Sequence, residues 1–341
     1  MPRIDFDAYI DDNAEPDSSK RDWRLARGRR APLGRQARVL HQVDLIEHAH
    51  KLPVEARGQT FAPTYQPAEH ERYWLLNYLE GFYNAQIITN VLGKVKGGKE
   101  ANVYCCAAHP STGLDLIAAK LYRPQMFRNL RNDAQYRQGR MVTDQDGKAS
   151  VRRREALAVR KNTRFGQELR HISWLEAEYQ TLQLLYAAGV DVPRPLARGE
   201  NVILMEYVGA RNAPAPALNQ VTLDRVEARR MFDRLVDQLA IMLACHRVHA
   251  DLSAYNILYW QGRFKLIDFP QAVDPRRNPD AADLFMRDVE RLCQYFAGYG
   301  MPQDAPALAT QLWSLYRRSN ALDASAVADE GIEAALLDQP R

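Results

Sequence analysis

The sequence contains little cysteine and no long hydrophobic run. Its 341 residues include four cysteines, none of which forms a C-x-x-C pair or a zinc-type spacing with histidine, so we expect reduced thiols in a reducing compartment. No stretch approaches the roughly 18 apolar residues that a membrane helix requires, and the acidic N-terminus lacks the basic-then-apolar order of a signal peptide. These absences predict a cytoplasmic protein that makes no use of a membrane.

Basic residues are distributed unevenly along the chain. The formal net charge is only +4, but residues 20–38 hold eight Lys or Arg against one acid, and residues 123–170 hold thirteen against five. Blocks of this kind are either solvated, mobile surface or contacts with a polyanion. Both interpretations stay open, so nucleic acid is a candidate partner of these two segments.

The hydrophobic pattern predicts an α+β protein of one large or two medium domains. With 46% hydrophobic residues, the chain is able to bury a sizeable core, although residues 1–64 show little periodicity and are expected to be mostly mobile. Apolar spacing predicts helices over residues 67–85, 172–188 and 222–246, and strands over residues 87–95, 101–107, 114–122 and 202–209. Cys105 and Cys106 fall in the second of these strands and are expected on its opposite faces.

Three polar side chains in the second half of the chain have the types and spacing of a phosphoryl-transfer centre. Asp268 offers a carboxylate and Asn256 an amide oxygen, and Mg²⁺ prefers such oxygen ligands while it neutralises the charge of a phosphate chain. A separate carboxylate, Asp251, is suited to orient an attacking hydroxyl and accept its proton. His249 completes the His-x-Asp-x₄-Asn spacing of kinases, and we expect it to pack and hydrogen-bond rather than act as a base.

The segment between Asn256 and Asp268 predicts how these two residues meet. Two short apolar runs, 257–260 and 263–267, flank Gln261-Gly262, which is typical of a tight hairpin. Such a hairpin returns Asp268 to the neighbourhood of Asn256. A chance occurrence of the spacing is the plain alternative, and the hairpin with its second aspartate argues against it.

A glycine turn, a lysine and a glutamate in the first half predict the nucleotide contacts. The turn at Gly98 and Lys99 almost matches a P-loop, but a glutamate replaces the Ser or Thr of that motif and a strand follows, so we expect a glycine-rich hairpin over the phosphates. Lys120 ends the third strand in a pattern that places a lysine against the α- and β-phosphates. Glu178 lies in an apolar helix stripe, where a carboxylate needs a partner, so we predict that it pairs with Lys120. Glu176, on another face of that helix, is the weaker candidate.

These motifs resemble those of the RIO family of atypical protein kinases, from about residue 90 to residue 300. The resemblance is carried by Gly98-Lys99-Glu100-Ala101-Asn102-Val103-Tyr104, Ala119-Lys120, Trp174 to Glu178, Ala213-Pro214-Ala215-Pro216, His249-Ala250-Asp251-Leu252-Ser253 with Asn256, and Ile267-Asp268. The first and fifth strings are similar to the first RIO subfamily, whereas Asp268-Phe269-Pro270-Gln271 is more like the second.

The resemblance implies a two-lobed protein-kinase-like fold with a trimmed C-terminal lobe. Residues 65–208 would form the N-lobe, with a flexible basic loop at 123–170 and the glutamate-bearing helix at 172–188. Residues 209–300 would form the C-lobe with the catalytic and metal-binding loops. Residues 301–341 would be a helical tail that the resemblance does not cover.

The resemblance also implies residue roles in a site for ATP and Mg²⁺, with Mn²⁺ as an alternative ion. The implied catalytic residues are Asp251 and Asp268, the metal ligands are Asn256 and Asp268, and the ATP contacts are Lys120, Glu178, Lys99, Gly98, Met205, Glu206 and Val208. The resemblance implies the catalytic role of Asp268 because, in family members that act as ATPase switches, the metal-site aspartate becomes transiently phosphorylated. The family usually has Ser-Thr before Gly98, whereas Lys96-Gly97 stand here and add a cation near the phosphates.

The implied activity is that of an ATP- and Mg²⁺-dependent serine/threonine protein kinase, acting on another protein or on itself. An ATPase switch or an RNA- or ribosome-associated assembly factor is the alternative, with segments 20–38 and 123–170 against RNA. A small-molecule kinase shares the His-x-Asp-x₄-Asn spacing. It would need a large helical lobe after Asp268, where only 73 residues remain.

Overall fold

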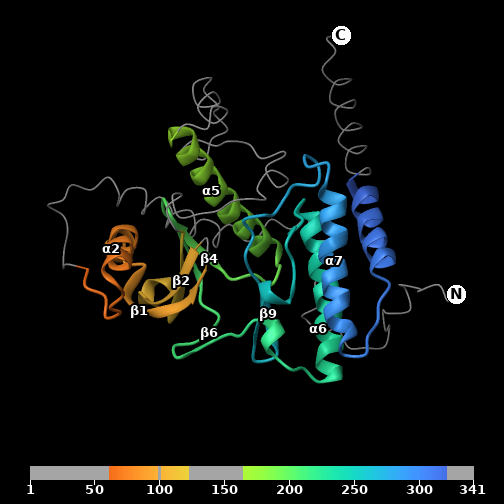
Figure 1. Ribbon diagram of the computed structural model, residues 1–341, viewed down its shortest axis with the longest axis horizontal. Helices are drawn as coiled ribbons and strands as arrows, with labels where there is room; N and C mark the ends of the chain where they lie inside the picture. The colour runs from red at the N-terminus through yellow and green to blue at the C-terminus, as the bar shows by residue number, and fades with distance from the viewer. Residues whose placement is uncertain (1–60, 99–100, 123–163, 321–341) are drawn as a thin grey trace, which may run out of the picture.

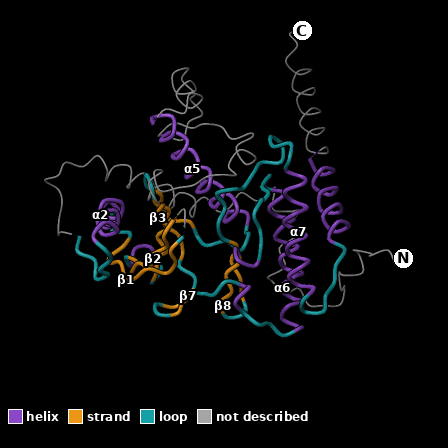
Figure 2. The backbone as a smooth tube through the Cα atoms, in the orientation of Figure 1, coloured by secondary structure: helices purple, strands orange, loops and turns teal. Residues whose placement is uncertain are grey.

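The computed structural model describes residues 61–98, 101–122 and 164–320. Several expectations fall on residues outside these ranges: the N-terminal arm to residue 60, the basic segment 20–38, the basic loop from 123 to 163, Lys99, and the tail beyond residue 320. The described part forms one group of elements dominated by strands and another dominated by helices (Figure 2).

The first group is a five-stranded antiparallel sheet with a helix against it. The strand order is β1-β2-β3-β5-β4, formed by β1 (Ile88–Gly97), β2 (Ala101–Ala108), β3 (Leu116–Tyr122), β4 (Pro195–Arg198) and β5 (Val202–Glu206). Helix α2 (Glu69–Asn84) buries Leu75, Leu79 and Phe82, which recur at helical spacing, in a core with side chains of β1, β2 and β3. The predicted helix 67–85 and the predicted strands 87–95, 101–107 and 114–122 are confirmed.

Helix α5 (Arg164–Ala188) joins the two groups. Leu175 and Tyr179 pack with residues of the sheet, whereas Leu182 and Leu185 belong to the helical core. The predicted start at residue 172 was wrong, because residues 164–170, assigned to a flexible loop, are helical. That stretch is rich in helix-favouring residue types, and one interior glycine costs only about 1 kcal/mol.

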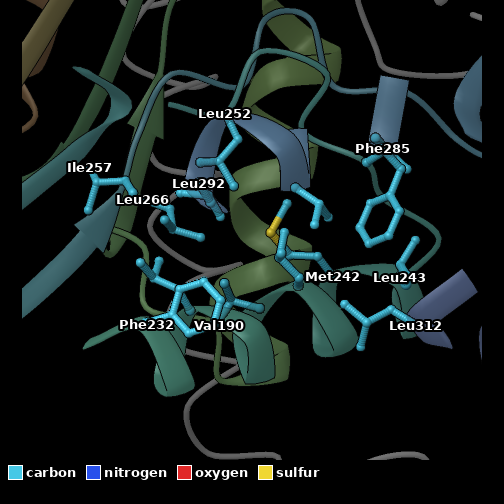
Figure 3. Close-up of a cluster of buried hydrophobic side chains, with 14 of the residues drawn as sticks. Val190, Phe232, Met242, Leu243, Leu252, Ile257, Leu266, Phe285, Leu292 and Leu312 are labelled. Atoms are coloured by element: carbon cyan, nitrogen blue, oxygen red, sulfur yellow. The ribbon is translucent and has the colours of Figure 1, made fainter. Parts of the chain in front are cut away.

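The second group consists of helices around a hairpin. Helix α6 (Arg225–Ala244) begins at Asp224, whose carboxylate accepts the Glu227 N–H at 2.8 Å, and α7 (Ala281–Ala297) lies beside it with a further helix over residues 305–320 (Figure 1). Their shared apolar core is shown in Figure 3. In Figure 1 the sheet with α2 and the helices α6 and α7 occupy opposite ends of the molecule, with α5 and the hairpin between them.

Two hairpins form separate two-stranded sheets outside the five-stranded sheet. Strands β8 (Ile257–Trp260) and β9 (Arg263–Leu266) are joined by Gln261 and Gly262, whose φ values of 49° and 75° are those of a type I′ turn, so the predicted hairpin is confirmed. Strands β6 (Gly209–Ala210) and β7 (Ala213–Pro214) form a smaller hairpin after β5. Single 3-10 turns occur at Pro110–Thr112, Leu218–Gln220 and Ala254–Asn256.

None of the four cysteines, all of which lie in the described part of the chain, forms a disulfide. Cys106 is buried in the core between the sheet and α2, and Cys105 belongs to a separate cluster with Tyr207, so the two point to opposite faces of β2 as expected. Among the described helices, none is long and apolar enough to cross a membrane.

Candidate active site

The segment after α6 brings the three predicted polar residues to one cavity. A 3-10 turn at Ala254–Asn256 follows Asp251, and the β8–β9 hairpin then returns the chain to Asp268. Asp251, Asn256 and Asp268 all line a cavity of about 630 Å³. Helix α7 supplies another part of the lining through Arg291, Gln294 and Tyr295.

Lys120 joins the sheet to this segment. Its Nζ lies 2.7 Å from Glu178 Oε1 on α5 and 2.6 Å from Asp268 Oδ1, so the predicted Lys120–Glu178 pair is present together with a second carboxylate. Burial disfavours the ammonium charge, but Asp268 and Glu178 outweigh that effect and raise the pKa of Lys120 well above its ordinary value. Burial likewise opposes the charge of Asp268, yet Lys120 holds the pKa of that carboxyl below its usual range. The lysine therefore remains an ammonium ion.

Glu178 is oriented by more than its lysine. The buried Tyr122 hydroxyl donates a hydrogen bond to Glu178 Oε2, while Lys120 Nζ lies 5.2 Å from the centre of the Tyr122 ring. Trp174 packs edge-on against that ring, with the two ring centroids 5.0 Å apart. Glu176 is directed elsewhere and pairs with Arg198.

Sequence reasoning missed Tyr122. It stands two residues after Lys120 and hence on the same face of β3, which is the signal that could have found it.

The carboxylate of Asp251 has two different neighbours. Arg291 Nη1 on α7 donates to Asp251 Oδ1 at 2.8 Å. Asn256 Nδ2 donates to the Asp251 carbonyl oxygen at 2.9 Å and lies 3.5 Å from Oδ2, a distance that makes the second contact weak. Asn256 thus uses its NH₂ group on the loop and keeps its amide oxygen for another partner.

Helix α7 also fixes the backbone on both sides of Asp251. Asp288 accepts the Ala250 N–H at 2.7 Å and the Leu252 N–H at 2.8 Å. Burial raises the pKa of Asp288 to about 7, although both N–H bonds favour its charged form. Sequence reasoning missed this residue. Its signal is a carboxylate within the apolar stripe of Leu284, Phe285, Val289 and Leu292, the same logic that selected Glu178.

His249 is buried and makes packing and hydrogen-bond contacts, as expected. Its Nε2 donates to the Ile267 carbonyl oxygen at 3.1 Å, and its ring centroid lies 4.7 Å from that of Phe269. Burial lowers the pKa of His249, so the ring is held in its neutral form. This contact ties the strand before Asp268 to the residues before Asp251.

The expected adenine and phosphate contacts lie around the sheet. The Gly98 N–H donates to the Ala101 carbonyl oxygen at 2.9 Å, and a Cβ at residue 98 would stand 2.9 Å from that oxygen, so the turn requires glycine. Met205 packs where the helical core meets the sheet clusters. Beyond it, the Glu206 N–H donates to Arg194 O at 2.8 Å, and Val208 O accepts the Ala215 N–H at 3.0 Å.

Asp268 and Asn256 fit a magnesium ion that shares its coordination with phosphate. No group of three or more His, Cys, Asp or Glu side chains within the described ranges is arranged to hold a metal. Mg²⁺ typically takes one or two protein oxygens and completes its shell with substrate phosphates and water. One carboxylate and one free amide oxygen at the same cavity match this requirement.

The antiparallel sheet contributes Lys120, which pairs with Glu178 of α5, and the helical half contributes Asp251, Asn256 and Asp268. Together these features define a protein-kinase-like fold. The family model described as RIO domain matches residues 102–308. The chain belongs to the RIO family.

Three similar proteins illustrate the match. The RIO-type serine/threonine-protein kinase Rio1 of Thermoplasma acidophilum is 35% identical over 131 residues, which are 38% of this chain and 67% of that protein. The serine/threonine-protein kinase RIO1 of Chaetomium thermophilum is 29% identical over 318 residues, or 86% of this chain and 57% of that protein. Rio1 of Haloferax volcanii is 31% identical over 221 residues, covering 63% and 66% respectively. The chain thus spans between half and about two thirds of the length of these relatives.

Proposed function

We propose that this chain is a RIO-type serine/threonine protein kinase that transfers the γ-phosphoryl group of ATP to a protein, itself included, in the presence of Mg²⁺. The observation that carries the proposal is the meeting of Asp251, Asn256 and Asp268 at one cavity, with Lys120 bonded to Asp268. The names of the relatives, all kinases of this type, support it. Cysteines without disulfides are typical of proteins that act in the cytoplasm, which we propose as the site of action.

Each residue has a distinct task in this proposal. Asp251 Oδ2 takes the proton of the acceptor hydroxyl as the hydroxyl oxygen bonds to the γ-phosphorus and the bond from phosphorus to ADP breaks. Asp268 and Asn256 would hold the magnesium ion, which would neutralise phosphate charge. Lys120, fixed by Glu178, binds the α- and β-phosphates.

The adenine would bind the backbone between β5 and β6. The Glu206 N–H and the Val208 carbonyl oxygen are engaged within the protein, so we assign the Glu206 carbonyl oxygen and the Val208 N–H to the adenine edge. Met205 would pack against the ring. The Gly98 turn, with Lys99, would cover the phosphates.

The test compares the wild-type chain with Asp251→Asn. Both are incubated with γ-labelled ATP and Mg²⁺, and label is followed on protein, on small molecules and as free phosphate. We expect label on protein, reduced by about 10²- to 10⁴-fold in the variant because the proton acceptor is lost. Asp233→Asn, which removes one partner of an exposed α6 ion pair, is the matched control and should leave the rate unchanged.

The other outcomes identify the competing functions. Free phosphate stimulated by RNA, with no label on protein, would indicate an ATPase switch associated with RNA or ribosomal particles. Label on a small molecule would indicate a small-molecule kinase. Either result would overturn the proposal.

A further inference from the structure

Helix α7 holds both the backbone and the side chain of the proposed catalytic base. Asp288 accepts the N–H groups that flank Asp251 in the sequence, and Arg291, three residues along the helix, bonds the Asp251 carboxylate itself. Residues three apart on a helix lie on neighbouring parts of one face. Asp251 is therefore oriented by two side chains of a single rigid element.

We propose that Arg291 is a positioning residue for phosphoryl transfer: it holds Asp251 Oδ1, so that Oδ2 alone faces the acceptor hydroxyl. This inference rests on the proposed function and deepens it, since it names a residue that selects which carboxylate oxygen takes the proton.

The contacts of the carboxylate support this assignment. The bond from Arg291 Nη1 to Oδ1, at 2.8 Å, is a charge-assisted hydrogen bond of normal length. The contact from Asn256 to Oδ2, at 3.5 Å, is at the limit of hydrogen bonding. Without Arg291, the carboxylate would rotate freely about its last side-chain bond, and either oxygen or neither would meet the acceptor.

Arg291 contacts the proposed base and not the proposed nucleotide lysine. Its Nη1 bonds Asp251, whereas Lys120 pairs with Glu178 and Asp268. Among the described residues that line the cavity at Asp251, Arg291 is the only cation. Removal of Arg291 should therefore affect the transfer step and leave nucleotide binding intact.

The Arg291–Asp251 ion pair contributes little to the stability of the fold. The side chains of Arg291 and Asp251 are 38% and 41% exposed, and pairs with this exposure contribute little to stability. A variant at Arg291 should consequently fold, so that a change in rate reports on the chemistry.

The experiment measures phosphoryl transfer by the full chain and by Arg291→Ala, Arg291→Lys and Arg229→Ala, with γ-labelled ATP and with casein as a generic acceptor. Arg229 belongs to an exposed pair on α6 and is the matched control. We expect Arg291→Ala to lower kcat by about 10²-fold, as a misplaced catalytic group does, with unchanged affinity for a non-hydrolysable ATP analogue. Arg291→Lys should restore part of kcat, and added methylguanidine should partly rescue Arg291→Ala.

Three outcomes decide the inference. An Arg291→Ala variant with full kcat, in a protein that Asp251→Asn inactivates, would overturn the inference and leave the proposed function standing. A variant whose loss of rate is rescued neither by lysine nor by methylguanidine would show a merely structural role. A wild-type chain that transfers no phosphoryl group would overturn both proposals.

Discussion

At the scale of single residues, the charged side chains of the site form ion pairs with one another. Lys120 lies between Glu178 and Asp268, and Arg291 bonds Asp251. Each ion therefore has an oppositely charged neighbour at hydrogen-bond distance before any ligand binds. In the proposed function, MgATP would exchange some of these contacts for contacts with phosphate and metal.

The buried His249 predicts a dependence of stability on pH. Its pKa is lowered by burial, so the unfolded chain binds a proton on this residue at a pH where the folded chain does not. Its contribution to the free energy of unfolding is complete above the unfolded pKa of about 6.5 and falls as the pH drops through that value. Chemical denaturation at pH 7.5 and pH 5.5 measures the effect.

His249→Gln is the control for this prediction. Glutamine keeps a donor for the Ile267 carbonyl oxygen and does not titrate, so part of the loss of stability between the two pH values should disappear. An identical pH dependence in both proteins would contradict the prediction.

Residue types and spacing predicted the residues of the proposed catalytic and nucleotide contacts, but not those that α7 contributes to the site. Asp251, Asn256, Asp268, Lys120 and Glu178 were found because the required spacing or the cost of a lone buried charge marks them in the sequence. Arg291 and Asp288 come from a helix that lies beyond the hairpin, and their contacts depend on how α7 packs. The apolar stripe of α7 marks Asp288 as a carboxylate that needs a partner, but no local pattern specifies which loop α7 packs against.

At the scale of elements, α5 sets the position of the lysine. Glu178 projects from the part of the helix that packs on the sheet, while the last turns of α5 pack in the helical core. A shift of α5 would carry Glu178 away from Lys120. The helix thus couples the arrangement of the two groups of elements to the proposed nucleotide contact of Lys120.

Glu178→Gln should therefore impair the use of ATP. Without the carboxylate charge, Lys120 keeps only Asp268 as a charged partner and leaves its place beside the phosphates, so kcat/KM for ATP should fall by up to about 10²-fold. Initial rates at varied ATP concentration measure this. Glu176→Gln, which changes a carboxylate on the same helix that pairs with Arg198, should keep its kcat/KM. Equal effects of both variants would contradict the assignment.

The turn of the β8–β9 hairpin predicts a difference between two glycines. Gly262 has φ +75°, where a Cβ costs about 1–2 kcal/mol, so Gly262→Ala should lower the free energy of unfolding by about that amount. A Cβ added at Gly93 in β1 would meet no atom within 4 Å, and the φ of that residue is not positive, so Gly93→Ala should be close to neutral. Equilibrium denaturation compares them, and a neutral Gly262→Ala would contradict the type I′ assignment.

Elements with a strong periodic pattern were the most predictable part of the fold. The hairpin and α2 follow from turn chemistry and from apolar spacing. The early start of α5 was not predictable from the sequence, because its first turns lie in a basic stretch whose composition also suits a loop.

At the scale of the whole molecule, the proposed nucleotide site is shared by the sheet and the helical half. Lys120 belongs to β3, and Asp268 follows β9. A ligand that contacts both residues stabilises their arrangement and hence the folded chain.

MgATP should accordingly raise the melting temperature of the wild-type chain. At a hundredfold excess over Kd, binding to the folded state alone contributes about 2.7 kcal/mol. Lys120→Met and Asp268→Asn should each lose most of the shift because each removes a contact from one half of the site. Thermal unfolding with and without MgATP measures this. A full shift in both variants would mean that the nucleotide binds elsewhere.

The central claim is that Asp251, Asn256 and Asp268 serve one metal–nucleotide complex. The most direct measurement is a crystal structure with Mn²⁺ and a non-hydrolysable ATP analogue, in which anomalous scattering locates the ion. The account predicts the ion bound to the Asp268 carboxylate and the Asn256 amide oxygen, with the γ-phosphate directed towards Asp251. An ion away from both ligands, or a γ-phosphate in a different cavity from Asp251, would contradict it.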